Sequence, residues 1–295
     1  MSISSSSAPE ITEPNAVFAK RRLPVGACDA HFHFFDAAHF PYAATRSYTP
    51  PDATMDNYAT MCRHFGIDRA VLVHPSVFGA DHSSMEQALE QHGDWLRGVA
   101  VVYPDTSDAQ IARWHALGVR GTRVNNLHAG GPSLSDLRRI VDKVAPFGWH
   151  VQLLIDLAIY PQLPGTVCDM GVSLVIDHIG HHPPQALASV AGFANLLSLV
   201  RAGTAWVKLS GPYRSSAQAP YYPDSSALVE SLLAANPRNL VWGTDWPHPP
   251  AHYPIPSDDV LVALVDRWLP DDALRQAVLV DNPARLYWGE HPQKS

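Results

Sequence analysis

The segment Asp29-Ala30-His31-Phe32-His33-Phe34-Phe35-Asp36 lies where the first apolar run of the chain ends, and it separates two α/β folds. A doubly wound sheet that binds a nucleotide carries a glycine-rich loop after its first strand, where the backbone approaches a phosphate group. This segment contains no glycine and carries two histidines instead. The sequence therefore disfavours a nucleotide-binding doubly wound sheet, and the remaining α/β candidate is a barrel.

Seven further apolar runs follow the first, and each is short enough for one buried strand. Segments between them, such as residues 107–117, 133–145 and 224–235, repeat apolar residues at helical spacing. Strands that alternate with helices pair in parallel through right-handed crossovers, and eight such units make a TIM barrel. Residues 257–279 are expected to form the last helical layer and residues 281–288 a C-terminal cap. The eight runs are residues 26–33, 70–75, 96–103, 119–125, 150–156, 173–178, 206–210 and 239–245.

These runs predict an α/β protein with one domain, a (β/α)8 TIM barrel over residues 21–295, behind a short flexible tail of residues 1–20. Hydrophobic residues make up 46% of the 295 residues and charged ones 17%, which excludes a disordered or coiled-coil chain. The net charge is −7, without a basic cluster, so nucleic acid and anionic membranes are not expected partners. Three cysteines without CxxC spacing and the lack of a signal peptide favour the cytoplasm. A homo-oligomer is compatible with the sequence.

Ionisable residues stand at the ends of the first, sixth and eighth runs, where TIM barrels carry their active sites. Alternation along the first strand predicts that Asp29, His31 and His33 face the barrel axis together. The sixth run ends on Asp177-His178, and the eighth on Gly243-Thr244-Asp245-Trp246-Pro247-His248. Burial beside apolar groups is expected to raise the pKa of Asp245, which suits a general base and equally a metal ligand. Core histidines and a helix N-cap are the structural alternatives for these residues.

The three motifs in this order resemble the amidohydrolase superfamily, and within it the lactonase branch that includes the pyrone dicarboxylate hydrolases. The resemblance extends from about Pro24 to Trp288. It implies a carboxylic ester hydrolase of aromatic compound catabolism that opens the ring of a small anionic lactone. It also implies that Asp245 takes a proton from water while His31, His33 and His178 polarise the lactone carbonyl.

Members of the superfamily usually hold one or two metal ions, but the resemblance to the lactonase branch implies that none is required here. The fifth run has no lysine that could be carbamylated, and the seventh ends without the extra histidine of metal-bound decarboxylases. A single zinc ion on His31, His33, His178 and Asp245 is the alternative, because zinc favours tetrahedral nitrogen and oxygen ligands.

The resemblance assigns substrate-binding roles to Arg123, Arg214, Ser76 and Tyr48, and His128 is a further specificity candidate. Arg123 is expected to face inward and Arg120, three residues earlier on the same strand, outward. The loop after Asn125 lacks the basic residue that a second ring carboxylate would need. A muconolactone-type substrate or a sugar-acid lactone is therefore as plausible as pyrone dicarboxylate. For each of these residues a solvated loop position is the structural alternative.

Three other functions fit the same residues. A zinc-dependent decarboxylase would use the same barrel, and a sugar-acid lactone isomerase would bind a similar ring. A non-catalytic binding or scaffold protein would keep the barrel without needing the Asp245 carboxylate. The first of these would lose its activity with a chelator, and the last would be unaffected by replacement of Asp245.

Overall fold

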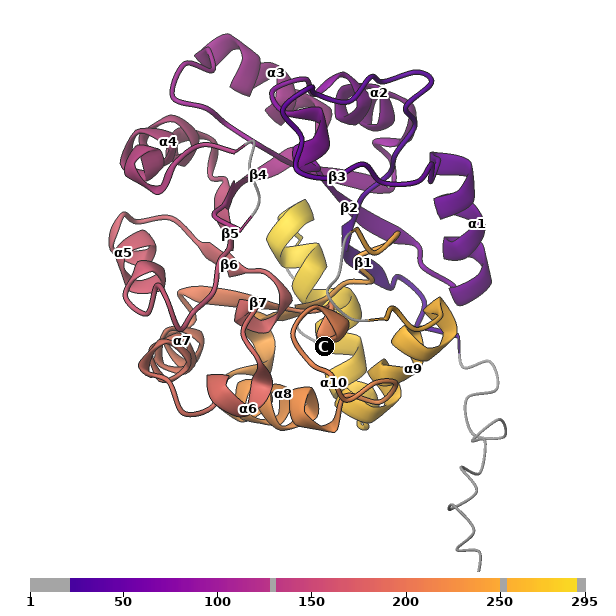
Figure 1. Cartoon of the computed structure of the whole chain (residues 1–295), viewed down its shortest axis with the longest axis vertical. Helices are drawn as coiled ribbons and strands as arrows, with labels where there is room; N and C mark the ends of the chain where they lie inside the picture. The colour runs from indigo at the N-terminus through magenta and orange to yellow at the C-terminus, as the bar shows by residue number, and fades with distance from the viewer. Residues whose placement is uncertain (1–21, 128–130, 250–253, 291–295) are drawn as a thin grey trace, which may run out of the picture.

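The computed structural model describes residues 22–127, 131–249 and 254–290. Eight parallel strands form one sheet in sequence order, and the sheet curls into a barrel inside a ring of helices (Figure 1). Each predicted run overlaps one strand, so the (β/α)8 fold is confirmed. The predicted tail, residues 1–20, lies outside the described residues, and its boundary with the barrel stays a prediction. The strands are β1 (Cys28–Phe32), β2 (Arg69–Val73), β3 (Leu96–Ala100), β4 (Val119–Asn125), β5 (His150–Leu154), β6 (Leu174–Ile176), β7 (Ala205–Leu209) and β8 (Leu240–Trp242).

The barrel closes between β1 and the segment that follows β8. The Asp245 amide donates a hydrogen bond to the His31 carbonyl oxygen at 2.8 Å, and the His33 amide donates to that of Trp246 at 2.7 Å. A Cβ atom on Gly243 would lie 2.8 Å from His31 Cβ, so this close approach requires glycine. Closure of the barrel therefore brings two of the predicted site segments side by side.

Helices cover the outside of the barrel and follow the strands as predicted. In α3, Ser107 caps the first turn by accepting from the Gln110 amide, Gly118 ends the helix in a left-handed conformation, and Ile111 and Trp114 face the core. The α-helices are α1 (Met55–Phe65), α2 (Ser83–His92), α3 (Asp108–Leu117), α4 (Leu137–Val144), α5 (Leu163–Asp169), α6 (Pro184–Leu187), α7 (Ala191–Ala202), α8 (Pro223–Ala235), α9 (Asp258–Trp268) and α10 (Asp272–Gln276).

Two predicted helical segments are divided. Residues 133–145 contain α4 with a 3-10 turn on each side, and residues 257–279 break between α9 and α10, where Pro270 cannot continue a helix. The predicted cap contains one π-helical turn, Ala284–Trp288, and a second, Ala277–Asp281, joins it to the end of the predicted last layer.

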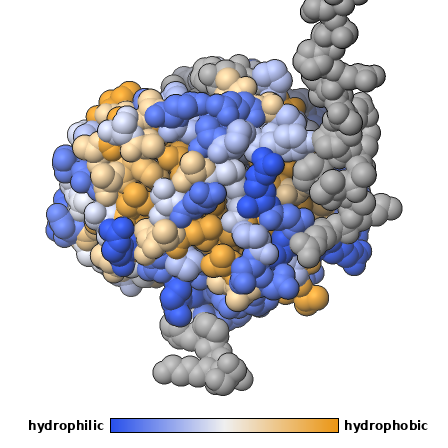
Figure 2. Space-filling model, turned by 90° about the horizontal axis from the view of Figure 1, so that it is seen from below, coloured by the Kyte–Doolittle hydropathy of each residue, from blue (hydrophilic) through white to orange (hydrophobic). Residues whose placement is uncertain are grey.

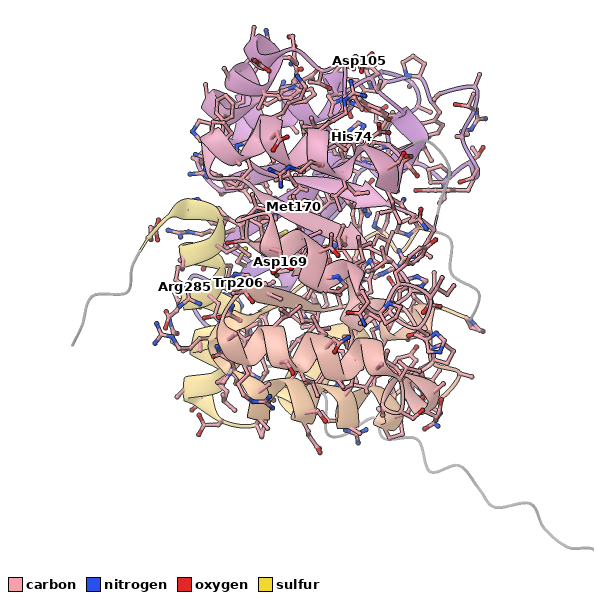
Figure 3. The ribbon with its side chains drawn as sticks, turned by 90° about the vertical axis from the view of Figure 1, so that its left-hand side faces the viewer. His74, Asp105, Asp169, Met170, Trp206 and Arg285 are labelled. Carbon is pink, nitrogen blue, oxygen red and sulfur yellow. The ribbon has the colours of Figure 1, made fainter. Side chains whose placement is uncertain are left out.

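This C-terminal segment covers the end of the barrel at which the strands begin. The Tyr287 side chain is fully buried against inward-facing residues that include Cys28 and Val71. The Arg285 guanidinium lies 4.7 Å from the centre of the Trp206 ring, and the two labelled residues are neighbours in Figure 3. This segment does not cover the opposite end of the barrel, where the strands finish, and a functional site can form there.

The alternation along β1 is interrupted. Cys28 and Ala30 belong to the inner cluster, and the pairing of β1 with β2 shifts register between Asp29 and Phe32. A β-bulge of this kind moves the following side chains to the other face. The prediction that Asp29 joins the histidines was therefore wrong. Its carboxylate instead accepts hydrogen bonds from the Thr244 amide and hydroxyl and from the Tyr58 hydroxyl.

The outer surface is mixed in character. Hydrophilic and hydrophobic side chains are interspersed on the face shown in Figure 2. Within the described residues, no helix combines the length and the apolar character needed to cross a membrane.

Candidate active site

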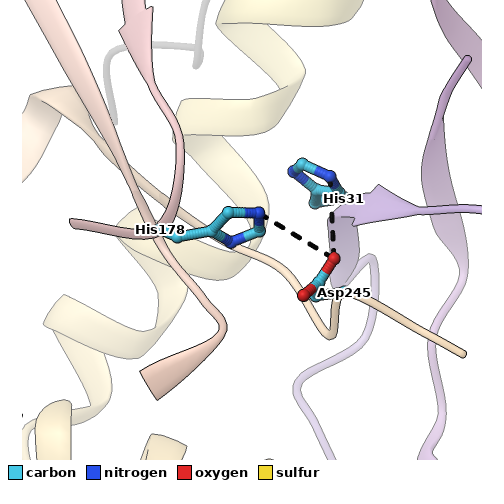
Figure 4. A group of neighbouring side chains, drawn as sticks. All are labelled: His31, His178 and Asp245. Carbon is cyan, nitrogen blue, oxygen red and sulfur yellow. Dashed lines mark ion pairs between the residues drawn. The ribbon is translucent and has the colours of Figure 1, made fainter. Parts of the chain in front are cut away.

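Four predicted catalytic residues meet at the end of the barrel where the strands finish. The Nε2 atoms of His31, His33 and His178 lie 3.8, 3.7 and 3.9 Å from Asp245 Oδ1. Figure 4 shows two of these imidazoles, on His31 and His178, turned toward the Asp245 carboxylate. All four side chains are buried. The structure thus gathers residues from the end of β1 and from the segments that follow β6 and β8 around one carboxylate oxygen.

A left-handed turn directs His178 into this cluster. His178 and Ile179 have φ angles of 48° and 58°, so the chain reverses direction directly after β6. His178 Nδ1 shares a 2.9 Å hydrogen bond with the Ser210 hydroxyl. The next residue, Gly211, has a φ of 57°, and a Cβ there would lie 2.9 Å from His178 Nδ1. Only glycine fits this backbone conformation beside the imidazole.

The two oxygens of Asp245 have different surroundings. Oδ2 accepts from the Tyr213 hydroxyl at 2.6 Å and from Arg214 Nε at 2.5 Å. Oδ1 has no hydrogen-bond partner among the described residues and faces the imidazoles. Burial alone would raise the pKa of Asp245, but the Arg214 guanidinium, together with the nearby His178 and His31, outweighs burial and holds that pKa well below its ordinary value. The expectation of a raised pKa was therefore wrong, because sequence alone did not reveal the arginine contact.

Hydrogen-bond partners fix which ring nitrogens of His31 and His33 carry hydrogen. His33 Nδ1 lies 2.6 Å from the Val73 carbonyl oxygen, which can only accept, so Nδ1 carries hydrogen. The Nε2 atom of neutral His33 is then an acceptor, and His31 Nε2, 3.3 Å away, donates to it. His31 Nδ1 in turn accepts from Lys208 Nζ at 3.4 Å. His31 therefore offers an N–H at the cluster, whereas His33 offers a lone pair.

The three imidazoles of the cluster are neutral near neutral pH. Burial and the neighbouring Lys208 lower the pKa of His31 to about 4. Burial also holds the pKa values of His33 and His178 well below the ordinary value. Polarisation of a substrate oxygen must therefore come from neutral N–H groups. The hydrogen bonds of His33 leave its Nε2 as an acceptor.

The predicted substrate-binding residues that the structure describes surround a small cavity above this cluster. The Tyr48 and Ser76 side chains are hydrogen-bond partners of each other in its wall. His128 lies outside the described residues, so its predicted role cannot be placed. The cavity is lined by His33, Tyr48, Ser76, Arg123, Asn125, Leu154, His178, Arg214 and Pro249.

The two arginines of β4 point in different directions, as predicted. Arg123 is 4% exposed and reaches the cavity, where it donates to the His74 carbonyl oxygen at 2.8 Å. Its Nε has no partner among the described residues. Arg120 is half-buried on the outer side and donates to the carbonyl oxygens of His115 and Val119. Arg123 is therefore the arginine of this strand that can meet a substrate anion.

A sequence model of the family described as Amidohydrolase matches residues 28–288. This chain belongs to the amidohydrolase family. The match extends from the first residue of β1 to the end of the C-terminal cap, so the family barrel includes all four clustered residues.

Lactone hydrolases are among the relatives of this amidohydrolase. It is 34% identical to the 2-pyrone-4,6-dicarboxylate hydrolase of Comamonas testosteroni over 281 residues, 91% of this chain and 92% of the relative. It is also 34% identical to the 4-sulfomuconolactone hydrolase of Rhizobium radiobacter over 276 residues, 90% of this chain and 91% of the relative. A Pseudomonas putida structure described as a 2-pyrone-4,6-dicarboxylic acid hydrolase superposes with a TM-score of 0.78 at 32% identity, covering 91% of this chain and 99% of the other.

Part of the cluster has the donor set of a metal site. His31, His178 and Asp245 each offer a ligand atom, and these atoms lie within 4.8 Å of one another. His33 is not in this compact group, although its Nε2 lies 3.7 Å from Asp245 Oδ1. Two imidazoles and an unpartnered carboxylate oxygen fit a single zinc ion. A Burkholderia multivorans amidohydrolase with bound Zn, 22% identical over 89% of this chain and 99% of the other, shares the fold with a TM-score of 0.68.

Beneath the cluster, Asp177 belongs to a buried polar layer whose other members, Lys208 and Gln152, were missed in the sequence. Lys208, Asp177 and Gln152 are all 0% exposed inside the barrel. Lys208 Nζ donates to Gln152 Oε1 at 2.8 Å and lies 3.6 Å from Asp177 Oδ1, while Gln152 donates to Asp177 Oδ2 at 2.8 Å. His31 Nδ1 lies 3.3 Å from Asp177 Oδ1 and 3.4 Å from Lys208 Nζ. This layer supports His31 from below.

Proposed function

We propose that this amidohydrolase hydrolyses the ring ester of a small anionic lactone. The observation that carries the proposal is the asymmetric Asp245 carboxylate, whose Oδ2 is held by two donors while Oδ1 faces the imidazole cluster below the cavity. A buried, ionised carboxylate with one free oxygen can take a proton from water. The relatives that carry lactone hydrolase names support the same reaction class.

The proposed reaction begins with water beside Asp245 Oδ1. Asp245 accepts one proton as the water oxygen bonds to the lactone carbonyl carbon, and the carbonyl oxygen gains negative charge. The His31 N–H moves its hydrogen bond from His33 to this oxygen, and His178, whose Nε2 lies 3.9 Å from Asp245 Oδ1, belongs to the same cluster. When the ring C–O bond breaks, Asp245 returns the proton to the departing ring oxygen. The product is an open-chain hydroxy acid, and its new carboxyl group, which keeps the second hydrogen of the water, releases that proton to solvent to become a carboxylate.

The charges in the cavity indicate the kind of lactone. Arg214 is paired with Asp245, so its charge is largely neutralised. Arg123 donates to a backbone carbonyl and keeps its positive charge for a ligand. Among the described residues, one guanidinium is therefore available for an acid group, with Tyr48 and Ser76 beside it. We infer a lactone with one carboxylate or sulfonate at this position as the preferred substrate.

A zinc ion bound by His31, His178 and Asp245 would act as a Lewis acid on the substrate carbonyl. The protein residues can perform each proposed step with their own hydrogen bonds, so we propose that no metal is required. A zinc-dependent decarboxylase is the alternative on the same residues. Location in the cytoplasm, a possible homo-oligomer and the absence of nucleic-acid or membrane partners stay predictions.

A panel of lactones tests the proposed function. We expect the wild-type protein to open anionic lactones, drawn from pyrone dicarboxylate, muconolactones bearing one carboxylate or sulfonate, and sugar-acid lactones, faster than neutral ones. Replacement of Arg123 by Met should raise KM for the preferred anionic lactone about ten- to hundredfold, because a hydrogen bond to a charged group contributes about 1.5–3 kcal/mol. Initial rates of ring opening measure both effects.

Arg120→Met is the matched control, since Arg120 lies on the same strand and bonds only to backbone on the outer side. It should leave KM unchanged. Each reaction is also run with a chelator, and unchanged rates are expected. Loss of activity that zinc restores would favour the metal-dependent alternative, and equal rates on anionic and neutral lactones would contradict the assignment of Arg123.

A further inference from the structure

A hydrogen-bonded chain leads from Asp245 to the protein surface through residues that do not line the cavity. The Tyr213 hydroxyl donates to Asp245 Oδ2 at 2.6 Å and lies 3.0 Å from His248 Nδ1. His248 Nε2 lies 2.7 Å from Asp258 Oδ1. The Tyr213 side chain is fully buried, His248 is 10% exposed and Asp258 is 34% exposed. None of the three lines the cavity.

The chain joins three separate parts of the fold. Tyr213 belongs to the 3-10 turn Pro212–Arg214 that follows β7, and His248 lies in the segment after β8. Asp258 is the first residue of α9, where a carboxylate is favoured by the helix dipole. The backbone amide of His248 also donates to the Asp245 carbonyl oxygen at 2.7 Å. The start of α9 thereby determines where the loop carrying Asp245 and its partner Tyr213 can lie.

The direction of each hydrogen bond follows from the two ends of the chain. Both ends are carboxylates, which only accept when ionised. Asp258 therefore receives the Nε2 hydrogen of His248, and Asp245 receives the single hydrogen of Tyr213. The tyrosine oxygen, with its hydrogen directed to Asp245, lies 3.0 Å from His248 Nδ1, and the contact of His248 with Asp258 holds this imidazole in place. In this state, the Tyr213 hydroxyl is committed to Asp245 and cannot turn away.

We propose that Asp258, His248 and Tyr213 form a positioning relay that holds Asp245 Oδ2, so that Oδ1 stays directed at the reacting water. A carboxylate held on one side by Arg214 alone could rotate about its terminal bond and present the wrong oxygen. Two donors on Oδ2, one of them fixed in direction by the relay, prevent this rotation. This inference rests on the lactone hydrolysis proposed above.

Asp258→Asn is the most direct test, because Asp258 is partly exposed and does not line the cavity. We expect kcat to fall about 10- to 100-fold with KM unchanged, the size of effect typical of residues that orient a catalytic group. Tyr213→Phe and His248→Gln should show the same kcat loss. Asp259→Asn is the matched control: it removes the neighbouring carboxylate from the same helical turn, where Asp259 is 73% exposed and pairs with His64. It should retain wild-type kcat.

A readout that needs no substrate separates positioning from a structural role. In protein labelled with nitrogen-15 at histidine, the His248 signals, identified by their loss in His248→Gln, should show hydrogen on Nε2, bonded to Asp258. Asp258→Asn should shift this Nε2 signal, and Asp259→Asn should leave it unchanged. A His248 Nε2 without hydrogen in the wild type, or an unchanged kcat in Asp258→Asn, would overturn the relay. If the wild type opened no lactone, the proposed function would be wrong. The nitrogen-15 signal of His248 would still test the hydrogen-bonded chain independently.

Discussion

Replacement of Asp245 by Asn is expected to lower the kcat of lactone hydrolysis by about 10²- to 10⁴-fold, the usual contribution of a general base. An amide at this position cannot accept a proton from water, because its nitrogen has no basic lone pair. The amide oxygen can still accept hydrogen bonds from Tyr213 and Arg214, so the asparagine side chain can take the position of the carboxylate without disturbing the fold. Steady-state kinetics on the best lactone of the panel measure the loss.

The fold of Asp245→Asn must be shown to survive for this result to count. The melting temperature and circular dichroism should stay close to those of the wild type. Asp156→Asn is the matched control. Asp156 is a half-buried carboxylate that follows β5, and its Oδ2 lies 2.9 Å from Nδ1 of a histidine, His182. It lies outside the cavity lining and should retain activity. An Asp245→Asn protein as active as the wild type would favour a non-catalytic or different site.

Replacement of Lys208 by Met is expected to lower the free energy of unfolding by about 3–5 kcal/mol, because it leaves a buried carboxylate without its cation. Lys208 and Asp177 are both 0% exposed and lie 3.6 Å apart. The Asp177 carboxylate lowers the cost of burying the Lys208 ammonium group. Burial nevertheless lowers the pKa of Lys208 to about 8. The methionine side chain has a similar length but offers no charge. Urea denaturation of the two proteins measures the difference.

Two variants separate this effect from general damage. Lys143→Met removes a lysine 25% exposed that pairs with the exposed Asp108, and it should cost about 1 kcal/mol or less. The double variant Lys208→Met with Asp177→Leu removes both buried charges and should recover part of the lost stability. If Lys208→Met were as stable as the wild type, the buried ion pair would not be a structural feature of the barrel interior.

The fold could be predicted from the sequence because strand and helix signals are local. Each apolar run predicted one strand, and the stretch around His31 excluded a nucleotide-binding loop. The ends of the helices were predicted less accurately than their order. The helix α4 is shorter than predicted, and Pro270 divides the last helical layer. Strict alternation placed Asp29 with the histidines, but the bulge in β1 turned it toward Thr244. A bulge depends on pairing between strands, which sequence periodicity alone does not show.

The site could be predicted in part for the same reason. Strand ends converge in a barrel, so His31, His33, His178 and Asp245 were expected to meet, and they do. The contact between Arg214 and Asp245 joins two loops that are distant in sequence, so the low pKa of Asp245 could not be foreseen. Lys208 did leave a signal: two residues from both Trp206 and Ser210, it lies on the inner face of β7 by alternation.

The central claim is that water, activated by Asp245, opens the ring of an anionic lactone at its carbonyl carbon. The reaction in water enriched in heavy oxygen, followed by mass spectrometry of the product, tests it most directly. We predict one solvent oxygen in the new carboxylate and none in the hydroxyl group. A product without solvent oxygen, as an isomerase would give, or release of carbon dioxide, as a decarboxylase would give, would contradict the claim.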